Sequence, residues 1–372
     1  MTDAAESPSQ KPPKQPAKLW QIALALGIGA IGGYIFLQMR LPLAWMMGAM
    51  CLTTAAAIAG VPIRMATKLR TGFLAILGVM LGSAFRPEIV QHLGEWVLTS
   101  VAMLAYVVLA GSLVYVYFRR FAGYDRATAY FSATPGGLSE MITIGTAMGG
   151  DERVISLTHG ARILLVVLTV PLFFRYFIGY EPPAGAVTGA SLVSIPLYDL
   201  GLLALCAVVG AALAKLARIP AAMLVGPMLV SAVVHLGGLT THAPPFELVA
   251  IAQVVIGTAI GCRFAGTKMA LVRRTVGVTI ISTALLLAMT VVFALLVHLI
   301  TSDIRTLDVV LAFAPGGLAE MSLVALAIGG DTAFVSSHHI IRIIFVVIFA
   351  PILFRLLIGR VLRREKAAAA DD

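Results

Sequence analysis

The feature that most constrains this chain is a short motif that occurs twice. Residues 135–141 read Pro-Gly-Gly-Leu-Ser-Glu-Met, and residues 315–321 read Pro-Gly-Gly-Leu-Ala-Glu-Met. The match continues without a gap, with 21 identities among the 46 aligned positions from Pro135 to Tyr180. Proline and paired glycines interrupt helices, and the glutamate that follows is charged. Any fold of this chain therefore has to accommodate two equivalent helix breaks, each followed by a glutamate.

The surroundings of the motif are those of a membrane protein. The chain has 59% hydrophobic and 12% charged residues, with a mean hydropathy of +0.96. Apolar runs of helix-spanning length recur along it, which predicts a polytopic membrane protein. Lys and Arg outnumber Asp and Glu by 27 to 18, but these charges lie in short loops, where the positive-inside rule explains them better than nucleic-acid binding does. The three cysteines are isolated and form neither a metal spacing nor a disulfide framework.

The chain divides into two repeats with polar ends and a polar link. We expect a disordered cytoplasmic tail (1–18), a first membrane repeat (19–180), a linker (181–197), a second membrane repeat (198–360) and a cytoplasmic tail with basic and acidic residues (361–372). The first apolar run, 19–37, is long enough to span a bilayer and is predicted to be retained rather than cleaved. The second apolar segment begins with Leu41-Pro42, where proline suits a first helical turn.

Loop charges predict that the repeats have opposite orientations. The loop after the second apolar segment carries Arg64, Lys68 and Arg70, whereas its counterpart, 239–247, has neither Lys nor Arg. The bias is reversed after the third segment: the first half has only Arg86, beside Glu88, and its counterpart has Arg263, Lys268, Arg273 and Arg274. Equivalent loops of opposite bias are typical of repeats inserted in opposite directions.

Opposite orientation requires an odd number of crossings in each half, yet each half has six apolar segments. The Pro-Gly-Gly segment is the one expected to enter and leave on the same side. The predicted fold is an all-α polytopic membrane protein with two inverted repeats of about five transmembrane helices each, each with a broken Pro-Gly-Gly re-entrant hairpin. Both termini are then cytoplasmic. The alternative, six full crossings in each of two parallel halves, places the basic C-terminal tail outside.

Breaks at membrane depth leave backbone groups unpaired, and these are tolerated only within protein or beside a watery cavity. The free helix ends offer sites for anions and cations. The alternative interpretation of the motif is a simple kink in a transmembrane helix. As ion- or substrate-binding candidates we take Pro135, Gly136, Gly137, Pro315, Gly316 and Gly317.

Glu140 and Glu320 lie in apolar stretches, so their charged forms need a partner, a cation or a proton. This predicts ion coupling through H⁺ or Na⁺. The alternative is a structural pair, for instance with an arginine of the next helix. Asp151 and Asp331 follow Gly-Gly and are suited to cap the following helix; they are included among the candidates.

The next helix carries a histidine and an arginine three residues apart, His159 with Arg162 and His339 with Arg342, and both therefore lie on one helix face. An arginine inside a membrane helix is costly unless it faces protein, water or an anion, and it fits carboxylate or phosphate bidentately. The alternative is an arginine that reaches back to the interface. The histidines either titrate near neutral pH or hydrogen-bond the hairpin backbone.

The remaining histidines are scattered, apart from adjacent His338 and His339, and none are four residues apart. No ligand set for copper, iron or zinc is evident. We therefore expect no catalytic residues, no metal, no cofactor and no enzymatic activity.

At the two Pro-Gly-Gly-Leu-x-Glu-Met motifs and the Gly-Gly-Asp that follows each, the chain resembles the duplicated membrane AbrB family of Gram-negative bacteria, over about residues 19–360. The resemblance implies the labels of that family, regulator of gene expression or ammonia monooxygenase. The two-half layout is also similar in architecture to secondary transporters with five-helix inverted repeats.

From these observations we expect a secondary transporter for a small anionic solute, working by alternating access between inverted repeats. Glu140 and Glu320 would couple to H⁺ or Na⁺, and Arg162 and Arg342 would hold substrate charge. The alternative is a membrane sensor that regulates gene expression through a partner or through solute levels. The expected location is the cytoplasmic (inner) membrane, in contact with lipid and without direct nucleic-acid binding; assembly into a homo-oligomer is open.

Overall fold

The computed structural model describes residues 17–87, 93–177, 179, 189–301 and 304–358. All regular secondary structure in these ranges is helical, which confirms the predicted all-α class. Most of the predicted N-terminal tail, the start of the predicted linker and the whole predicted C-terminal tail lie outside the described residues.

The same series of helices occurs twice. The first half contains α1 (Leu19–Gln38), α2 (Ala44–Ile58), α3 (Thr67–Gly82), α4 (Leu93–Arg120), α5 (Arg126–Ala133), α6 (Leu138–Ala147) and α7 (Glu152–Phe177). The second contains α8 (Leu197–Leu216), α9 (Ala222–Leu236), α10 (Phe246–Gly261), α11 (Met269–Ile300), α12 (Thr306–Phe313), α13 (Leu318–Ala327) and α14 (Thr332–Leu353), with short 3₁₀ and π turns at η2 (Cys262–Phe264) and η3 (Phe354–Ile358). Equivalent helices have matching lengths: 20 residues for α1 and α8, 15 for α2 and α9, and 16 for α3 and α10. The internal repeat seen in the sequence is therefore also a repeat of elements.

The start of α2 differs from the sequence-based expectation. Pro42 does not lie in the first helical turn, because α2 begins only at Ala44. Leu43, between them, has a left-handed backbone with φ of 50°, and Ala221 before α9 repeats this with φ of 52°. Such backbone is unfavourable for a residue with a side chain, so its recurrence shows that the turn itself is a duplicated feature.

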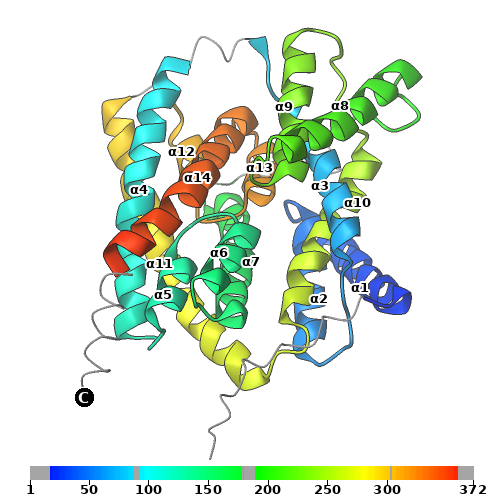
Figure 1. Cartoon of the computed structure of the whole chain (residues 1–372). Helices are drawn as coiled ribbons and strands as arrows, with labels where there is room; N and C mark the ends of the chain where they lie inside the picture. Colours follow the sequence, from blue (N-terminus) through cyan, green and yellow to red (C-terminus); the bar gives the residue numbers. More distant parts are fainter. Residues whose placement is uncertain (1–16, 88–92, 178, 180–188, 302–303, 359–372) are drawn as a thin grey trace, which may run out of the picture.

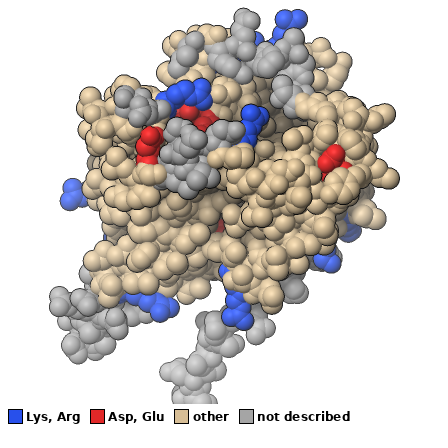
Figure 2. Space-filling model, turned by 90° about the horizontal axis from the view of Figure 1, so that it is seen from above, with Lys and Arg blue, Asp and Glu red and all other residues tan. Residues whose placement is uncertain are grey.

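Seven helices of the described chain are long and apolar enough to cross a membrane: Leu19–Gln38, Gly94–Arg120, Glu152–Phe177, Leu197–Leu216, Phe246–Phe264, Met269–Ile300 and Thr332–Leu357. Helices α2 and α9, with 15 residues each, extend only about 22 Å, less than the ~30 Å of a bilayer core. The space-filling view in Figure 2 is dominated by uncharged side chains, with few and separate charges. The protein is a multi-pass membrane protein.

The helices form two groups that lie side by side in Figure 1. The first, which we call the α1 group, contains α1, α2, α3, α8, α9 and α10. The second, the α4 group, contains α4 to α7 and α11 to α14. Each group draws on both halves of the chain: α3 packs on α9 and α10 on α2 in the α1 group, and α11 packs on α4 and α7 in the α4 group. The boundary between groups is thus not the boundary between repeats.

Glycines allow the helices of the α1 group to touch backbone to backbone. A Cβ on Gly32 of α1 would collide with the backbone of Gly48 in α2, and one on Gly210 of α8 would collide with that of Gly226 in α9. Gly78 of α3 contacts the Leu224 carbonyl of α9 in the same way. Small residues at helix contacts are what close packing in a membrane requires. The α1 group is therefore a tightly packed unit.

Each Pro-Gly-Gly motif interrupts its helix, so that α5 and α6 form a first broken pair and α12 and α13 a second. The start of α5 lies beside the end of α6, since the Asp151 N–H donates a 2.8 Å hydrogen bond to Thr128 Oγ1. In the second broken pair the Asp331 N–H donates an equivalent 2.8 Å bond to Asp308 Oδ1. The two short helices of each pair fold back on one another, which a kinked continuous helix would not do.

Candidate binding site at the broken helices

An arginine of the following helix holds the break of the second pair. Arg342 in α14 is 1% exposed, and its Nη1 and Nη2 donate 2.7 Å hydrogen bonds to the carbonyls of Ala314 and Gly316. Ala314 is the C-terminal cap of α12, so its carbonyl has no partner within that helix. The guanidinium thereby supplies the missing donors and places a positive charge at the negative end of the α12 dipole.

His339, one turn earlier, completes this arrangement. Its Nε2 lies 3.1 Å from the Leu311 carbonyl, which can only accept, so Nε2 carries the proton. Its Nδ1 is then free to accept a 2.9 Å hydrogen bond from Arg342 Nη2. Of the two roles considered for the histidines, the contacts match hydrogen bonding to the backbone of the broken pair.

The first broken pair has the same arrangement with fewer bonds. His159 Nε2 donates to the Phe131 carbonyl at 2.8 Å, and its Nδ1 accepts from Arg162 Nη2 at 2.6 Å. Arg162 Nη1 donates to the Ser132 carbonyl at a longer 3.3 Å. Both arginines also have a buried Nε without a hydrogen-bond partner among the described residues. The break of the first pair is therefore held less firmly than that of the second.

Each motif glutamate curls back over a glycine of its own motif. A Cβ on Gly137 would collide with the Glu140 carboxylate, and one on Gly317 would collide with that of Glu320. Glu320 is 7% exposed, whereas Glu140 is only partly buried. Neither carboxylate forms an ion pair with the arginine of the next helix, because Arg162 and Arg342 are bonded to backbone carbonyls. The structural pair considered from the sequence is not the arrangement found in these described helices.

The two aspartates after Gly-Gly are helix caps. Asp331 Oδ1 accepts from the Phe334 N–H at 2.9 Å, and Asp151 Oδ1 accepts from the N–H groups of Arg153 and Val154 at 2.8 and 3.2 Å. Aspartate at this position also favours the helix N-terminus electrostatically. Both carboxylates thus lie at the open ends of the broken pairs, away from Pro135 and Pro315 at the breaks.

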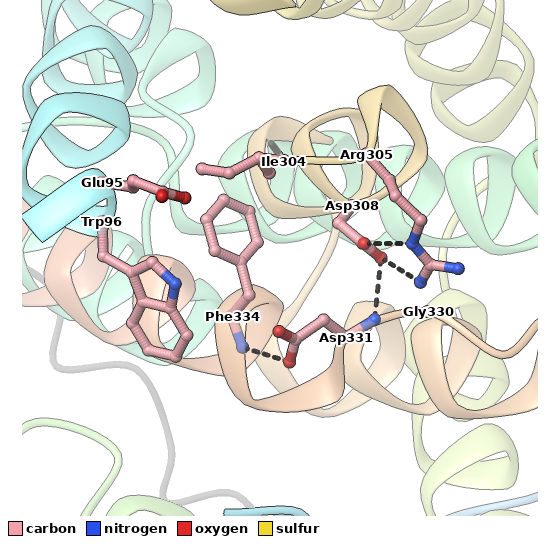
Figure 3. Close-up of a pocket in the computed structure, with 8 residues that line it drawn as sticks. All are labelled: Glu95, Trp96, Ile304, Arg305, Asp308, Gly330, Asp331 and Phe334. Atoms are coloured by element: carbon pink, nitrogen blue, oxygen red, sulfur yellow. Dashed lines mark hydrogen bonds and ion pairs between the residues drawn. The ribbon is translucent and has the colours of Figure 1, made fainter. Parts of the chain in front are cut away.

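A cavity of about 380 Å³ opens at the end of the second broken pair, between α4, α12 and α14 (Figure 3). It is lined by Glu95, Trp96, Ile304, Arg305, Asp308, Gly330, Asp331 and Phe334. Asp308 is held on two sides, by the Arg305 guanidinium at 2.9 and 3.2 Å and by the Asp331 N–H. Burial raises the pKa of the Asp308 carboxyl, and the hydrogen bond from Arg305 opposes this. The cavity is large enough for a small solute and gives access to the base of the second broken pair.

Two arginines that the sequence suggested only as loop charges lie near Glu320. Arg70 belongs to the start of α3 and Arg263 to η2, and both act electrostatically on the Glu320 carboxylate. An extended stretch, 61–66, connects α2 to α3. One sequence signal could have identified the two arginines. Their repeat equivalents, Val249 and Ala84, are uncharged, so both break the internal repeat.

The comparisons with known proteins assign the chain to a family. The family model described as transition state regulatory protein AbrB matches residues 45–358, from the start of α2 to the end of η3. The chain belongs to the AbrB family. It is 31% identical over 362 residues to a Bacillus subtilis (strain 168) protein designated YhjN, covering 91% of this chain and 92% of the relative. It is 26% identical over 338 residues to an Escherichia coli (strain K12) protein that carries the name of a regulator, AbrB, covering 90% and 94% of the two chains.

These relatives confirm the family expected from the motifs, and they correct one detail. A family confined to Gram-negative bacteria is too narrow, because one of the two relatives comes from Bacillus. Both AbrB-family alignments extend over nearly the whole chain, so the resemblance concerns the complete helical unit rather than the motifs alone.

Proposed function

We propose that this protein is a secondary transporter for a small anionic solute, coupled to H⁺ or Na⁺. The observation that carries the proposal is the pair of breaks inside a membrane protein, each followed by an acid and one of them, Glu320, buried. Non-helical backbone and a buried carboxylate are costly in a bilayer and are tolerated where they serve a solute or ion site. Broken helices arranged as pairs are typical of secondary transporters.

The division into two helix groups supplies a mechanism. The α1 group is fastened internally by glycine contacts, and both broken pairs belong to the α4 group. The tip of the second pair reaches the boundary, since α13 packs against α3. We propose that the α4 group moves against the α1 group and exposes the breaks to each side in turn, which is alternating access.

Helix directions support repeats of opposite orientation. Gly78 and Gly82 of α3 contact Leu224 and Met228 of α9, so residue numbers rise together and the two helices are parallel. Because α2 and α3 run in opposite directions in Figure 1, α2 is antiparallel to α9, its equivalent. The same figure has α4 running from top to bottom and α11 from bottom to top. Under this proposal the broken pairs re-enter the membrane from opposite sides.

Charge supports an orientation with both termini in the cytoplasm. The ends of α4 and the start of α11 carry Arg119, Arg120, Lys268, Arg273 and Arg274 and lie together at the bottom of Figure 1. Basic residues are retained on the cytoplasmic side of a bilayer. We propose the cytoplasmic (inner) membrane as the location, with lipid, solute and coupling ion as partners and without direct contact with nucleic acid.

Glu320 is the stronger candidate for ion coupling, and Glu140 the weaker, because only Glu320 is fully removed from water. A buried carboxylate loses its net charge when it binds a proton or forms a pair with Na⁺. Binding of the ion to this carboxylate can therefore be linked to the position of the α4 group. Arg162 and Arg342 contribute by holding the breaks through backbone carbonyls. Their direct use as substrate ligands remains a prediction from the sequence.

A proteoliposome assay tests the proposal. The purified full chain is reconstituted with a pH-sensitive or a sodium-sensitive dye inside, and phosphate and mono-, di- and tricarboxylates are added outside in turn under a proton or a sodium gradient. We expect one class to drive proton or sodium movement, and Glu320→Gln to abolish the coupled flux. If no anion drives coupled movement of protons or sodium, the proposal is rejected. If the coupled flux is unchanged in both Glu140→Gln and Glu320→Gln, the coupling roles of these two residues are rejected.

The alternative function is a membrane sensor that regulates gene expression, and the regulator name of the Escherichia coli relative favours it. It requires that deletion of the gene alters transcripts while proteoliposomes remain inactive. The two functions are compatible if transport changes solute levels and the solute levels in turn change transcription. Enzymatic activity is not part of the proposal.

A further inference from the structure

Arg70 and Arg263 converge on the boundary between the two helix groups. Both belong to the α1 group, one at the start of α3 and one just after α10. The aliphatic part of Arg263 lies against Gly160 of α7, where a Cβ would be 3.6 Å from its Cδ. Glu320, from the tip of the second broken pair, belongs to the α4 group. The three charged side chains therefore lie within electrostatic range of one another where the groups face each other.

The two guanidiniums lie within electrostatic range of one another, which is unfavourable for two like charges unless something negative offsets it. Glu320 attracts both, but it is not within ion-pair distance of either arginine in the described chain. The buried Nε of each arginine has no hydrogen-bond partner among the described residues. The single carboxylate of Glu320 does not balance the charge of two arginines. Positive charge and hydrogen-bond donors of Arg70 and Arg263 are therefore left for another negatively charged group.

Both side chains are only partly buried. This distinguishes them from Arg162 and Arg342, which are 3% and 1% exposed and bonded to backbone carbonyls. The latter pair is repeated in both halves, as expected for residues that hold a repeated structure. Arg70 and Arg263 are matched by Val249 and Ala84, so they serve something that the chain needs only once.

We propose that Arg70 and Arg263 form the binding site for the transported solute, and that this solute carries an oxyanion, a carboxylate or a phosphate. Guanidinium groups fit both anions bidentately and keep their charge when partly desolvated. The site lies between a fixed and a moving group, where a bound anion would draw them together. This inference rests on the proposed transport function in so far as it calls the bound anion a transported solute. The anion site itself can be tested by binding alone.

The test measures thermal stability of the purified full chain in a neutral detergent, with phosphate, acetate, succinate or citrate as probe and chloride at matched ionic strength as control. We expect at least one oxyanion to raise Tm in a saturable manner. Arg70→Gln and Arg263→Gln should weaken its binding by roughly tenfold to a hundredfold, the loss expected for a charge-assisted hydrogen bond. Lys68→Gln and Arg273→Gln, exposed neighbours that lose the same charge, should leave the affinity unchanged.

A variant that does not fold leaves the inference testable through Arg263→Lys, which keeps the charge but lacks the planar fork. It should bind the same oxyanion more weakly than wild type. Stabilisation that is equal for chloride and oxyanions, or equal in the arginine and control variants, would overturn the site. So would stabilisation by phosphatidylglycerol in mixed micelles but by no soluble oxyanion, because the arginines would then hold a lipid headgroup.

The binding test separates this inference from the proposed function. Oxyanion binding that depends on both arginines, together with inactive proteoliposomes, would support the site and reject transport, leaving an anion sensor. Coupled flux in proteoliposomes that is unchanged in Arg70→Gln and Arg263→Gln would support transport and reject the site. Loss of both binding and flux in the arginine variants, with both retained in Lys68→Gln, would support the two together.

Discussion

Arg342 Nη2 donates a 2.7 Å hydrogen bond to the carbonyl of Gly316, the first glycine of the second Pro-Gly-Gly motif. The arginine, in α14, thus stabilises the backbone of the break from across the intervening helix α13. In the first half, Arg162 instead makes a single 3.3 Å backbone bond, to the carbonyl of Ser132, three residues before the motif. This difference between the repeats leads to the first prediction.

Arg342→Lys should loosen the second break more than Arg162→Lys loosens the first. A lysine ammonium cannot reproduce the fork that reaches two carbonyls, so at least one buried carbonyl is left unsatisfied, at a cost of about 1–3 kcal/mol. Hydrogen exchange followed by mass spectrometry should show faster exchange in α12 and α13 for the Arg342 variant. Equal protection of the two broken pairs in the two variants would contradict this account.

A second prediction concerns Asp308 and Thr128, which occupy equivalent positions and accept equivalent 2.8 Å bonds from the N–H groups of Asp331 and Asp151. Asp308→Thr should therefore keep the end of the second broken pair closed. Asp308→Ala should open it, because the Asp331 N–H loses its hydrogen-bond acceptor, a loss of about 0.5–1.5 kcal/mol. Tm measurements of the two variants check this, and Thr128→Ala serves as the matched control in the first repeat. A Thr variant as unstable as the Ala variant would show that the Arg305 ion pair is what matters there.

Much of the helical outline could be predicted from the sequence because it depends on local signals. Proline and paired glycines end α5 and α12, and Asp151 and Asp331 cap the starts of α7 and α14. The start of α2 was misplaced because Leu43, the residue after Pro42, has a left-handed backbone that the sequence alone does not reveal. The grouping of helices from both halves was also not predictable, since it arises from long-range contacts such as Gly78 against Leu224.

The site was predicted in part, for a related reason. The motif residues were found by repetition, and the structure brings each histidine and arginine to its own break. What repetition could not show is that those arginines would donate hydrogen bonds to the backbone carbonyls of the breaks. Repetition also could not identify Arg70 and Arg263, because neither arginine has a charged equivalent in the other repeat.

The third prediction tests orientation. In a variant without the native cysteines, Arg120→Cys and Lys268→Cys should both be labelled from the cytoplasm by a membrane-impermeant maleimide, although they follow different segments of the two repeats. Thr241→Cys, in the loop between α9 and α10, should be labelled only from the opposite side. All three substituted positions are exposed. Labelling of positions 120 and 268 from opposite faces would mean parallel repeats and would remove the support for alternating access.

The last prediction concerns the charge balance at Glu320. An oxyanion held by Arg70 and Arg263 lies near the Glu320 carboxylate and is repelled by it, unless that carboxylate is protonated or bound to Na⁺. Among the described residues, these two arginines are the charged groups that act on Glu320 from α3 and η2. Arg342 of α14 is bonded to the break backbone.

Binding of the anion should therefore be linked to uptake of a proton or of Na⁺ at Glu320. For proton coupling, wild-type affinity for the oxyanion rises as pH falls, with sodium having no effect; for sodium coupling, affinity rises with sodium at constant ionic strength. Glu320→Gln, which is uncharged throughout, should bind the anion at least as tightly as wild type and without either dependence. Glu140→Gln, the matched change at the half-exposed position, should retain the wild-type dependence. An affinity that varies with pH or sodium to the same extent in Glu320→Gln as in wild type would place the coupling ion elsewhere in the protein.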